Sequence, residues 1–157
     1  MPSTNPEKKE PPRVVLDTNV MVSGLLWKGK SNQILEWVEE GKLELCQSKK
    51  TLEELTQVLD YPRIKKRVKK LGMKADEIIV SVERGSKIFD ILTNEAVVTE
   101  DPDDDIFINL ALTSGAKFIV SGDSHLLNIG QHKDIKILSP NQFVNMFKMK
   151  RRQGQYL

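Results

Sequence analysis

Carboxylates follow apolar runs at three places in this chain. Asp17 comes directly after Val14–Leu16, Asp123 comes shortly after a late apolar run, and the other acids lie at 101–105. Oxygen ligands without a cysteine or histidine cluster suit Mg²⁺ or Mn²⁺ rather than Zn²⁺. Such ions can activate water for attack on a phosphodiester, which would explain why no serine, lysine or histidine accompanies Asp17.

Each of these acids also has a purely structural explanation. Asp17 could cap the helix that follows it, the acids at 101–105 could form a turn before a helix, and Asp123 could be a turn residue. These explanations weaken if the acids converge, because neighbouring carboxylates repel one another and raise each other's pKa. A bound cation offsets that repulsion, so convergence of the acids favours a metal site.

Another acid, Glu54, lies on the predicted helix 49–59 at the margin of its buried leucine stripe. A carboxylate there can reach the rim of a crevice, although a solvated helix surface is the ordinary alternative. The two histidines of the chain are His125 and His132. We expect both to be surface or packing residues rather than catalysts.

The elements that would position the acids alternate between strands and helices. Ser48 is a good N-cap for helix 49–59, Gly115 is a good helix end, and Pro140 opens a final helix. Strand patterns occupy 13–17, 42–46, 96–98, 117–121 and 135–138. Helix patterns occupy the segment from 19 onward, 31–41, 49–59, 63–72, 75–89, 103–115, 122–128 and 141–147.

This alternation predicts an α/β fold with a mostly parallel sheet and helices on both of its faces. In such folds the ligand crevice lies beyond the carboxyl ends of the strands. Asp17, the acids at 101–105 and Asp123 each follow a predicted strand. We therefore expect them to meet at one edge of the sheet.

The composition indicates one ordinary globular domain. The chain has 157 residues, 39% hydrophobic and 29% charged, with a net charge of +2. Its single cysteine, Cys46, excludes an internal disulfide and fits a reducing cytoplasm. No apolar run approaches the roughly 18 residues of a membrane span, and no signal-peptide pattern is present. We expect a disordered tail at 1–12, a domain at 13–147 and a basic tail at 148–157.

Four segments of the chain resemble the PIN-domain nucleases, in particular the small single-domain toxins of toxin–antitoxin systems. They read VVLDTNVMVSGLLW, TLEELTQVL, DPDDDIFINLALTSGAKFIVSGDSHLL and ILSPNQF. The resemblance implies a three-layer α/β/α sandwich and a Mg²⁺- or Mn²⁺-dependent ribonuclease that cleaves RNA through metal-activated water. It further implies a homodimer and a possible antitoxin partner in the cytoplasm, with no membrane association.

The resemblance also assigns roles to individual residues. The family's acidic positions correspond to one acid at each of the places considered above, with the third position falling on either Asp104 or Asp105. Two polar side chains accompany them as supporting residues. The full set is Asp17, Glu54, Asp104 or Asp105, and Asp123, with Asn19 and Ser121 as the supporting pair. The metal ligands would be Asp17, Asp104 or Asp105, and Asp123.

RNA binding needs positive charge, and a lysine-rich helix pattern at 64–71 supplies it. Its lysines, together with one before Glu54, could neutralise backbone phosphates, although a solvated helix face explains them equally well. These candidates are Lys65, Lys66, Lys69 and Lys49. No stacking platform for single strands is evident, because Trp27, Trp37, Tyr61 and Phe107 are scattered; we expect them in the core or an interface.

Other folds with an acid after the first strand fit less well. A haloacid-dehalogenase-type phosphatase needs a second Asp two residues on, where this chain has Asn19. A response-regulator receiver domain needs a late-strand lysine, where this chain delivers Asp123. The remaining alternative is a PIN-like module that binds RNA or a protein without cleaving.

Overall fold

A six-stranded sheet forms the centre of the computed structural model, which describes residues 10–98 and 101–154. The strand order is β3-β2-β1-β4-β6-β5, and all neighbours are parallel except the pair β5 and β6. The strands are β1 (Arg13–Leu16), β2 (Glu44–Gln47), β3 (Ser86–Ile88), β4 (Phe118–Val120), β5 (Gln131–His132) and β6 (Ile135–Leu138). The mostly parallel sheet is therefore confirmed.

Helices connect the parallel strands, as parallel pairing requires. They are α1 (Thr18–Leu26), α2 (Lys30–Glu39), α3 (Lys49–Leu59), α4 (Pro62–Lys70), α5 (Ala75–Arg84), α6 (Asp105–Ser114), α7 (Ser124–Ile129) and α8 (Pro140–Arg152). A single 3₁₀ turn, η1 (Pro102–Asp104), leads into α6. Among the described residues no helix is long and apolar enough to cross a membrane.

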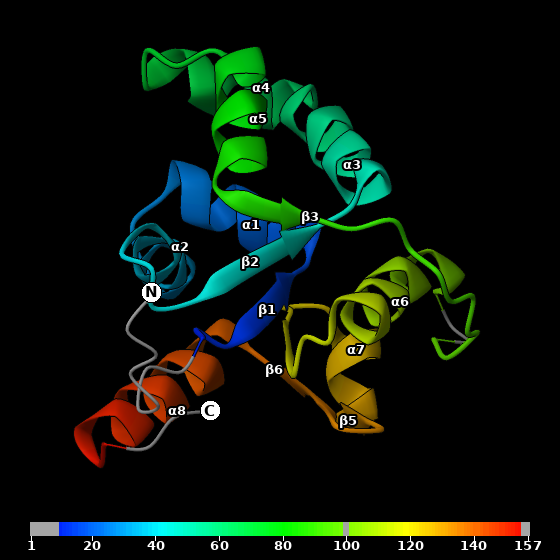
Figure 1. Ribbon diagram of the computed structural model, residues 1–157. Coiled ribbons are helices and arrows are strands. Elements are labelled where there is room, and N and C mark those ends of the chain that lie inside the picture. The colour runs from blue at the N-terminus through cyan, green and yellow to red at the C-terminus, as the bar shows by residue number, and fades with distance from the viewer. Residues whose placement is uncertain (1–9, 99–100, 155–157) are drawn as a thin grey trace, which may run out of the picture.

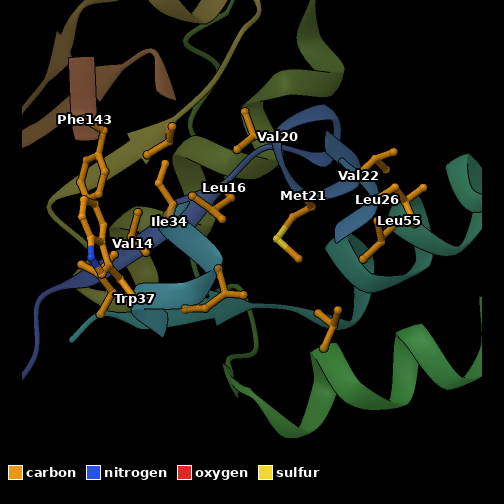
Figure 2. Packing of buried hydrophobic residues seen from close by; sticks show 14 of the residues in the cluster. Val14, Leu16, Val20, Met21, Val22, Leu26, Ile34, Trp37, Leu55 and Phe143 are labelled. Atoms are coloured by element: carbon orange, nitrogen blue, oxygen red, sulfur yellow. The ribbon is translucent and has the colours of Figure 1, made fainter. Parts of the chain in front are cut away.

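Alternating side chains of the strands pack into two separate layers of core. Val14 and Leu16 of β1 join the cluster made with α1–α5 and α8, whereas Val15 joins the cluster made with α6 and α7. Figure 1 shows α6 and α7 on one side of the sheet and α1 and α2 on the other. In the larger cluster Trp37 and Phe143 close one end and Leu26 and Leu55 the other (Figure 2). The three-layer arrangement is thus confirmed.

Local signals in the sequence form the predicted helix ends. The Ser48 hydroxyl accepts the Thr51 N–H at 3.1 Å in a reciprocal capping box, and Ser139 caps α8 in the same way ahead of Pro140. Gly115 ends α6 with a φ of 74°, a left-handed conformation that favours glycine. The last helix continues to Arg152, into the segment predicted as a basic tail, and residues 1–9 of the predicted N-terminal tail lie outside the described residues.

Two predicted elements are wrong. Residues 96–98 form no strand, because the Val97 and Val98 N–H groups donate to the Asp105 carboxylate at 2.9 and 2.7 Å instead of to a neighbouring strand. The third strand is β3, which pairs with β2 inside the segment predicted as the helix 75–89. That helix ends at Arg84, and Gly85 follows it as the cap.

Candidate active site

Asp17 stands at the point where β1 ends and α1 begins. Its side chain is 4% exposed and accepts the Val20 N–H at 2.8 Å, which makes it the N-cap of α1. The Ser121 hydroxyl donates to the other oxygen of the same carboxylate. Asp17 is therefore a helix cap, but Ser121 ties it to a second strand as well.

Ser121 connects the acids that follow β1 and β4. Besides donating to Asp17, its hydroxyl oxygen accepts the Asp123 N–H at 2.9 Å. The Asp123 carboxylate in turn accepts the His125 N–H at 2.7 Å. The strand order reverses between β1 and β4, which is where open α/β sheets place their ligand crevice. Asp17 and Asp123 thus meet where the topology predicts a site.

The acids between β3 and α6 reach the same place. One ligand atom from each of Asp101, Asp104, Asp123 and His125 lies within 4.8 Å of all the others. The Asp104 Oδ2 atom is buried, and no hydrogen-bond donor contacts it within the described residues. An acceptor buried without a donor is costly. An oxygen-rich group of this kind, with one imidazole, fits a divalent cation such as Mg²⁺ or Mn²⁺.

The electrostatics of the site agree with that geometry. Burial, followed by the nearby Asp123, Asp101 and Asp17 carboxyls, raises the pKa of Asp104 to about 8. Burial also raises the pKa of Asp17, against the lowering effect of its hydrogen bonds. These acids would be easier to ionise beside a cation, since opposite charge favours the charged form.

Glu54 on α3 faces the same group of acids from the helix that follows β2. Its pKa is raised, first by burial and then by Asp103, Asp17 and Asp101, while the Thr18 hydroxyl lowers it by hydrogen bonding. Glu54 and Asp103 also line one surface hollow. The charge of Glu54 therefore interacts with the charges of the site acids. Glu54 is not one of the four residues whose ligand atoms all lie within 4.8 Å of one another.

The geometry separates the two neighbouring candidates for the third acid. Asp104 faces Asp123 in the acid cluster, whereas Asp105 turns one carboxylate oxygen to the N–H groups of Val97 and Val98. That contact fixes the segment leading into the site. Asp105 therefore anchors this segment and also lines the hollow that contains Glu54, while Asp104 lies with Asp101, Asp123 and His125.

The sequence of residues 13–125 matches the family model described as the PIN domain. The chain belongs to the PIN domain family. PIN domains are generally metal-dependent nucleases, and the acid cluster is compatible with that chemistry.

A solved structure shares the fold of this PIN domain. It is the crystal structure of PAE2754 from Pyrobaculum aerophilum, with a TM-score of 0.53 and 15% sequence identity over 89% of this chain and 91% of that chain. At this identity the likeness shows the fold alone. None of the curated proteins searched matches the chain.

Two side chains of the cluster were not among the predicted site residues of this PIN domain. The sequence predicts that the acids at 101–105 reach this edge of the sheet but assigns Asp101 no role of its own, and it predicts a surface or packing position for His125. The His125 Nδ1 atom lies 3.6 Å from Asp123 Oδ1. The sequence signal for this contact is that His125 comes two residues after Asp123. The supporting residue Asn19 is exposed and lines a neighbouring groove rather than contacting the Asp17 carboxylate.

The predicted RNA-binding lysines lie on α3 and α4 and are not members of the acid cluster. Lys65, Lys66 and Lys69 are exposed on α4, where Lys65 pairs with Asp60 at 3.4 Å, and Lys49 is exposed at the start of α3. Among the aromatic residues, Trp37 and Phe107 are buried as expected, but Trp27 and Tyr61 are exposed. These two line a single groove, so they are not scattered in space.

The raised pKa of Asp104 predicts an unusual pH dependence of stability in the presence of a chelator. Below about pH 4 this carboxyl is protonated in both states; between about pH 4 and 8 it stays protonated in the folded state but ionises in the unfolded state. Its contribution therefore favours the fold at acidic pH and is lost as the pH rises toward 8. We expect the melting temperature in EDTA to fall more between pH 5 and 8 in the parent than in Asp104→Asn. If thermal melts showed the same fall of melting temperature with pH in both proteins, that result would contradict the proximity of the acids.

Proposed function

We propose that this PIN domain is a ribonuclease that hydrolyses RNA phosphodiester bonds with Mg²⁺ or Mn²⁺. The observation that carries the proposal is the convergence of Asp17, Asp104 and Asp123, from three separate segments, where the strand order reverses. Repelling, partly buried carboxylates in one place are costly for the fold unless a cation neutralises them.

The residues that would hold the cation are Asp101, Asp104, Asp123 and His125, with Asp17 beside them. When bound, a divalent ion supplies activation of water and neutralisation of the developing phosphate charge. The Ser121 hydroxyl fixes the relative position of Asp17 and Asp123, and the Val20 N–H and His125 N–H hold their carboxylates in place. The protein thus presents its acids in a preset arrangement.

The substrate is proposed to be held by positive charge outside the acid cluster. The exposed lysines Lys65, Lys66 and Lys69 of α4, and Lys49 of α3, can neutralise backbone phosphates of the RNA. A role as the toxin of a toxin–antitoxin pair, an antitoxin partner and a homodimer stay predictions from the family resemblance.

A cleavage assay tests this function directly. The purified chain is expected to cut a labelled single-stranded RNA in Mg²⁺ or Mn²⁺, to stop in EDTA, and to recover when the metal is restored. Asp17→Asn should lose most of the activity while retaining a folded circular dichroism spectrum. If the folded parent bound RNA without cutting it in either metal, the chain would be a binding module instead.

A further inference from the structure

A groove runs along the side of the site where α1, the end of α3 and the start of α4 meet. Asn19 of α1, two residues after Asp17, lines this groove, as does Trp27, which follows that helix. Val58 and Tyr61 line this groove and also the hollow that contains Glu54 and Asp103. The groove therefore adjoins the hollow that contains Glu54 and Asp103.

Two aromatic side chains are presented on this groove instead of in the core. Trp27 is 38% exposed and Tyr61 is 56% exposed, whereas the other tryptophan, Trp37, is 6% exposed. Arg67 holds Trp27 in place: its guanidinium lies 5.1 Å from the centre of the indole ring and donates to the Leu26 carbonyl at 2.9 and 3.0 Å. An aromatic ring that is fixed yet exposed is a suitable surface for stacking a nucleobase.

The charge of the groove matches a nucleic acid strand. Arg63 is its only charged lining residue within the described chain, and Lys65 and Lys66 are exposed farther along the same helix. Single-strand-binding proteins combine this same pair of features, stacking rings for the bases and cations for the phosphates. The acid cluster by itself would repel a phosphate backbone, so cations next to it are needed to hold the strand.

We propose that this groove binds an unstacked nucleobase of single-stranded RNA next to the scissile phosphodiester. Tyr61 and Trp27 stack on the base, Arg63 contacts a neighbouring phosphate, and the Asn19 amide is placed to hydrogen-bond the base or sugar. The inference rests on the proposed ribonuclease function and adds to it a groove that holds a base beside the acid site.

Intrinsic fluorescence can report on the groove, because the chain has two tryptophans and only Trp27 is exposed. The full chain in EDTA, which prevents cleavage, is titrated with an RNA oligonucleotide of about eight nucleotides, within the site sizes of single-strand-binding folds. The same titration uses an abasic oligonucleotide of equal length and charge. We expect quenching by the RNA, weaker binding of the abasic strand, and no quenching in Trp27→Phe.

Variants of Tyr61 test whether RNA binding needs an aromatic ring at this position. Tyr61→Ala is expected to weaken RNA binding about tenfold, within the range found for loss of one stacked base, while Tyr61→Phe retains binding. Met149→Ala on α8, which removes an exposed apolar side chain elsewhere, is expected to change nothing. Binding is measured by anisotropy of a labelled RNA, so that it does not depend on tryptophan emission.

Several results would overturn the groove proposal but leave the proposed ribonuclease function intact. Equal affinity for the RNA and the abasic strand, or unchanged binding by Tyr61→Ala, would exclude a stacked base. A dimer in sedimentation that Tyr61→Ala dissociates would make the groove an interface between copies of the chain. Conversely, base-dependent quenching with no cleavage in Mg²⁺ or Mn²⁺ would support the groove and overturn the ribonuclease.

Discussion

Asp104→Asn is expected to lower metal-dependent RNA cleavage by at least about 100-fold, the upper end of what even an outer-shell partner of a metal site contributes. The reason is its position: Asp104 lies within the group of oxygen and nitrogen atoms spanning 4.8 Å, and its buried Oδ2 atom has no donor in the described structure. The same change should raise the melting temperature in EDTA near pH 8, because at that pH the raised pKa of Asp104 beside the other acids costs the folded state stability.

Asp105→Asn is the matched control, one residue away with the same chemical change. Its carboxylate accepts the Val97 and Val98 N–H groups, and a neutral amide oxygen accepts them more weakly. We expect a loss of about 1 kcal/mol in the free energy of unfolding and cleavage close to the parent's. Initial rates and thermal melts of both variants check this. The opposite pattern, with cleavage lost only in Asp105→Asn, would mean that the wrong acid has been placed in the site.

Mn²⁺ is expected to stabilise the parent protein by about 2.7 kcal/mol at a hundredfold excess over its dissociation constant, because it binds only the assembled site. For a chain of this length that corresponds to roughly 5–10 °C in melting temperature. Asp17→Asn should have two opposite effects. Without metal it should melt higher than the parent, since burial disfavours the charged carboxylate. With Mn²⁺ it should lose most of the shift.

Glu39→Gln serves as the control for this second experiment, because Glu39 is an exposed acid on α2 and lies outside the site. It should show neither the higher metal-free melting temperature nor the smaller Mn²⁺ shift. If Asp17→Asn behaved like Glu39→Gln in differential scanning fluorimetry, Asp17 would be a helix cap alone. The nuclease proposal would then rest on family membership without support from a shared acid site.

Much of the fold could be predicted from the sequence because its signals are local. A capping serine, a left-handed glycine and an opening proline mark helix ends at Ser48, Gly115 and Pro140 regardless of the surroundings. The third strand was placed wrongly because its position depends on contacts between distant segments rather than on local signals. Residues 86–88 form a strand because the edge of β2 is available there, and residues 96–98 do not because the Asp105 carboxylate takes their N–H groups.

The sequence by itself determined that acids follow β1 and β4 and precede α6, because the order of apolar runs and carboxylates can be read directly from it. Only the tertiary structure shows how the surroundings of Asp104 and Asp105 differ. Adjacent residues at a helix start point in different directions, and which one faces Asp123 depends on how η1 leads into α6. The structure also placed His125 among the acids and brought Trp27 and Tyr61 into one groove. Proximity between residues from different elements depends on how those elements pack, and no local pattern records it.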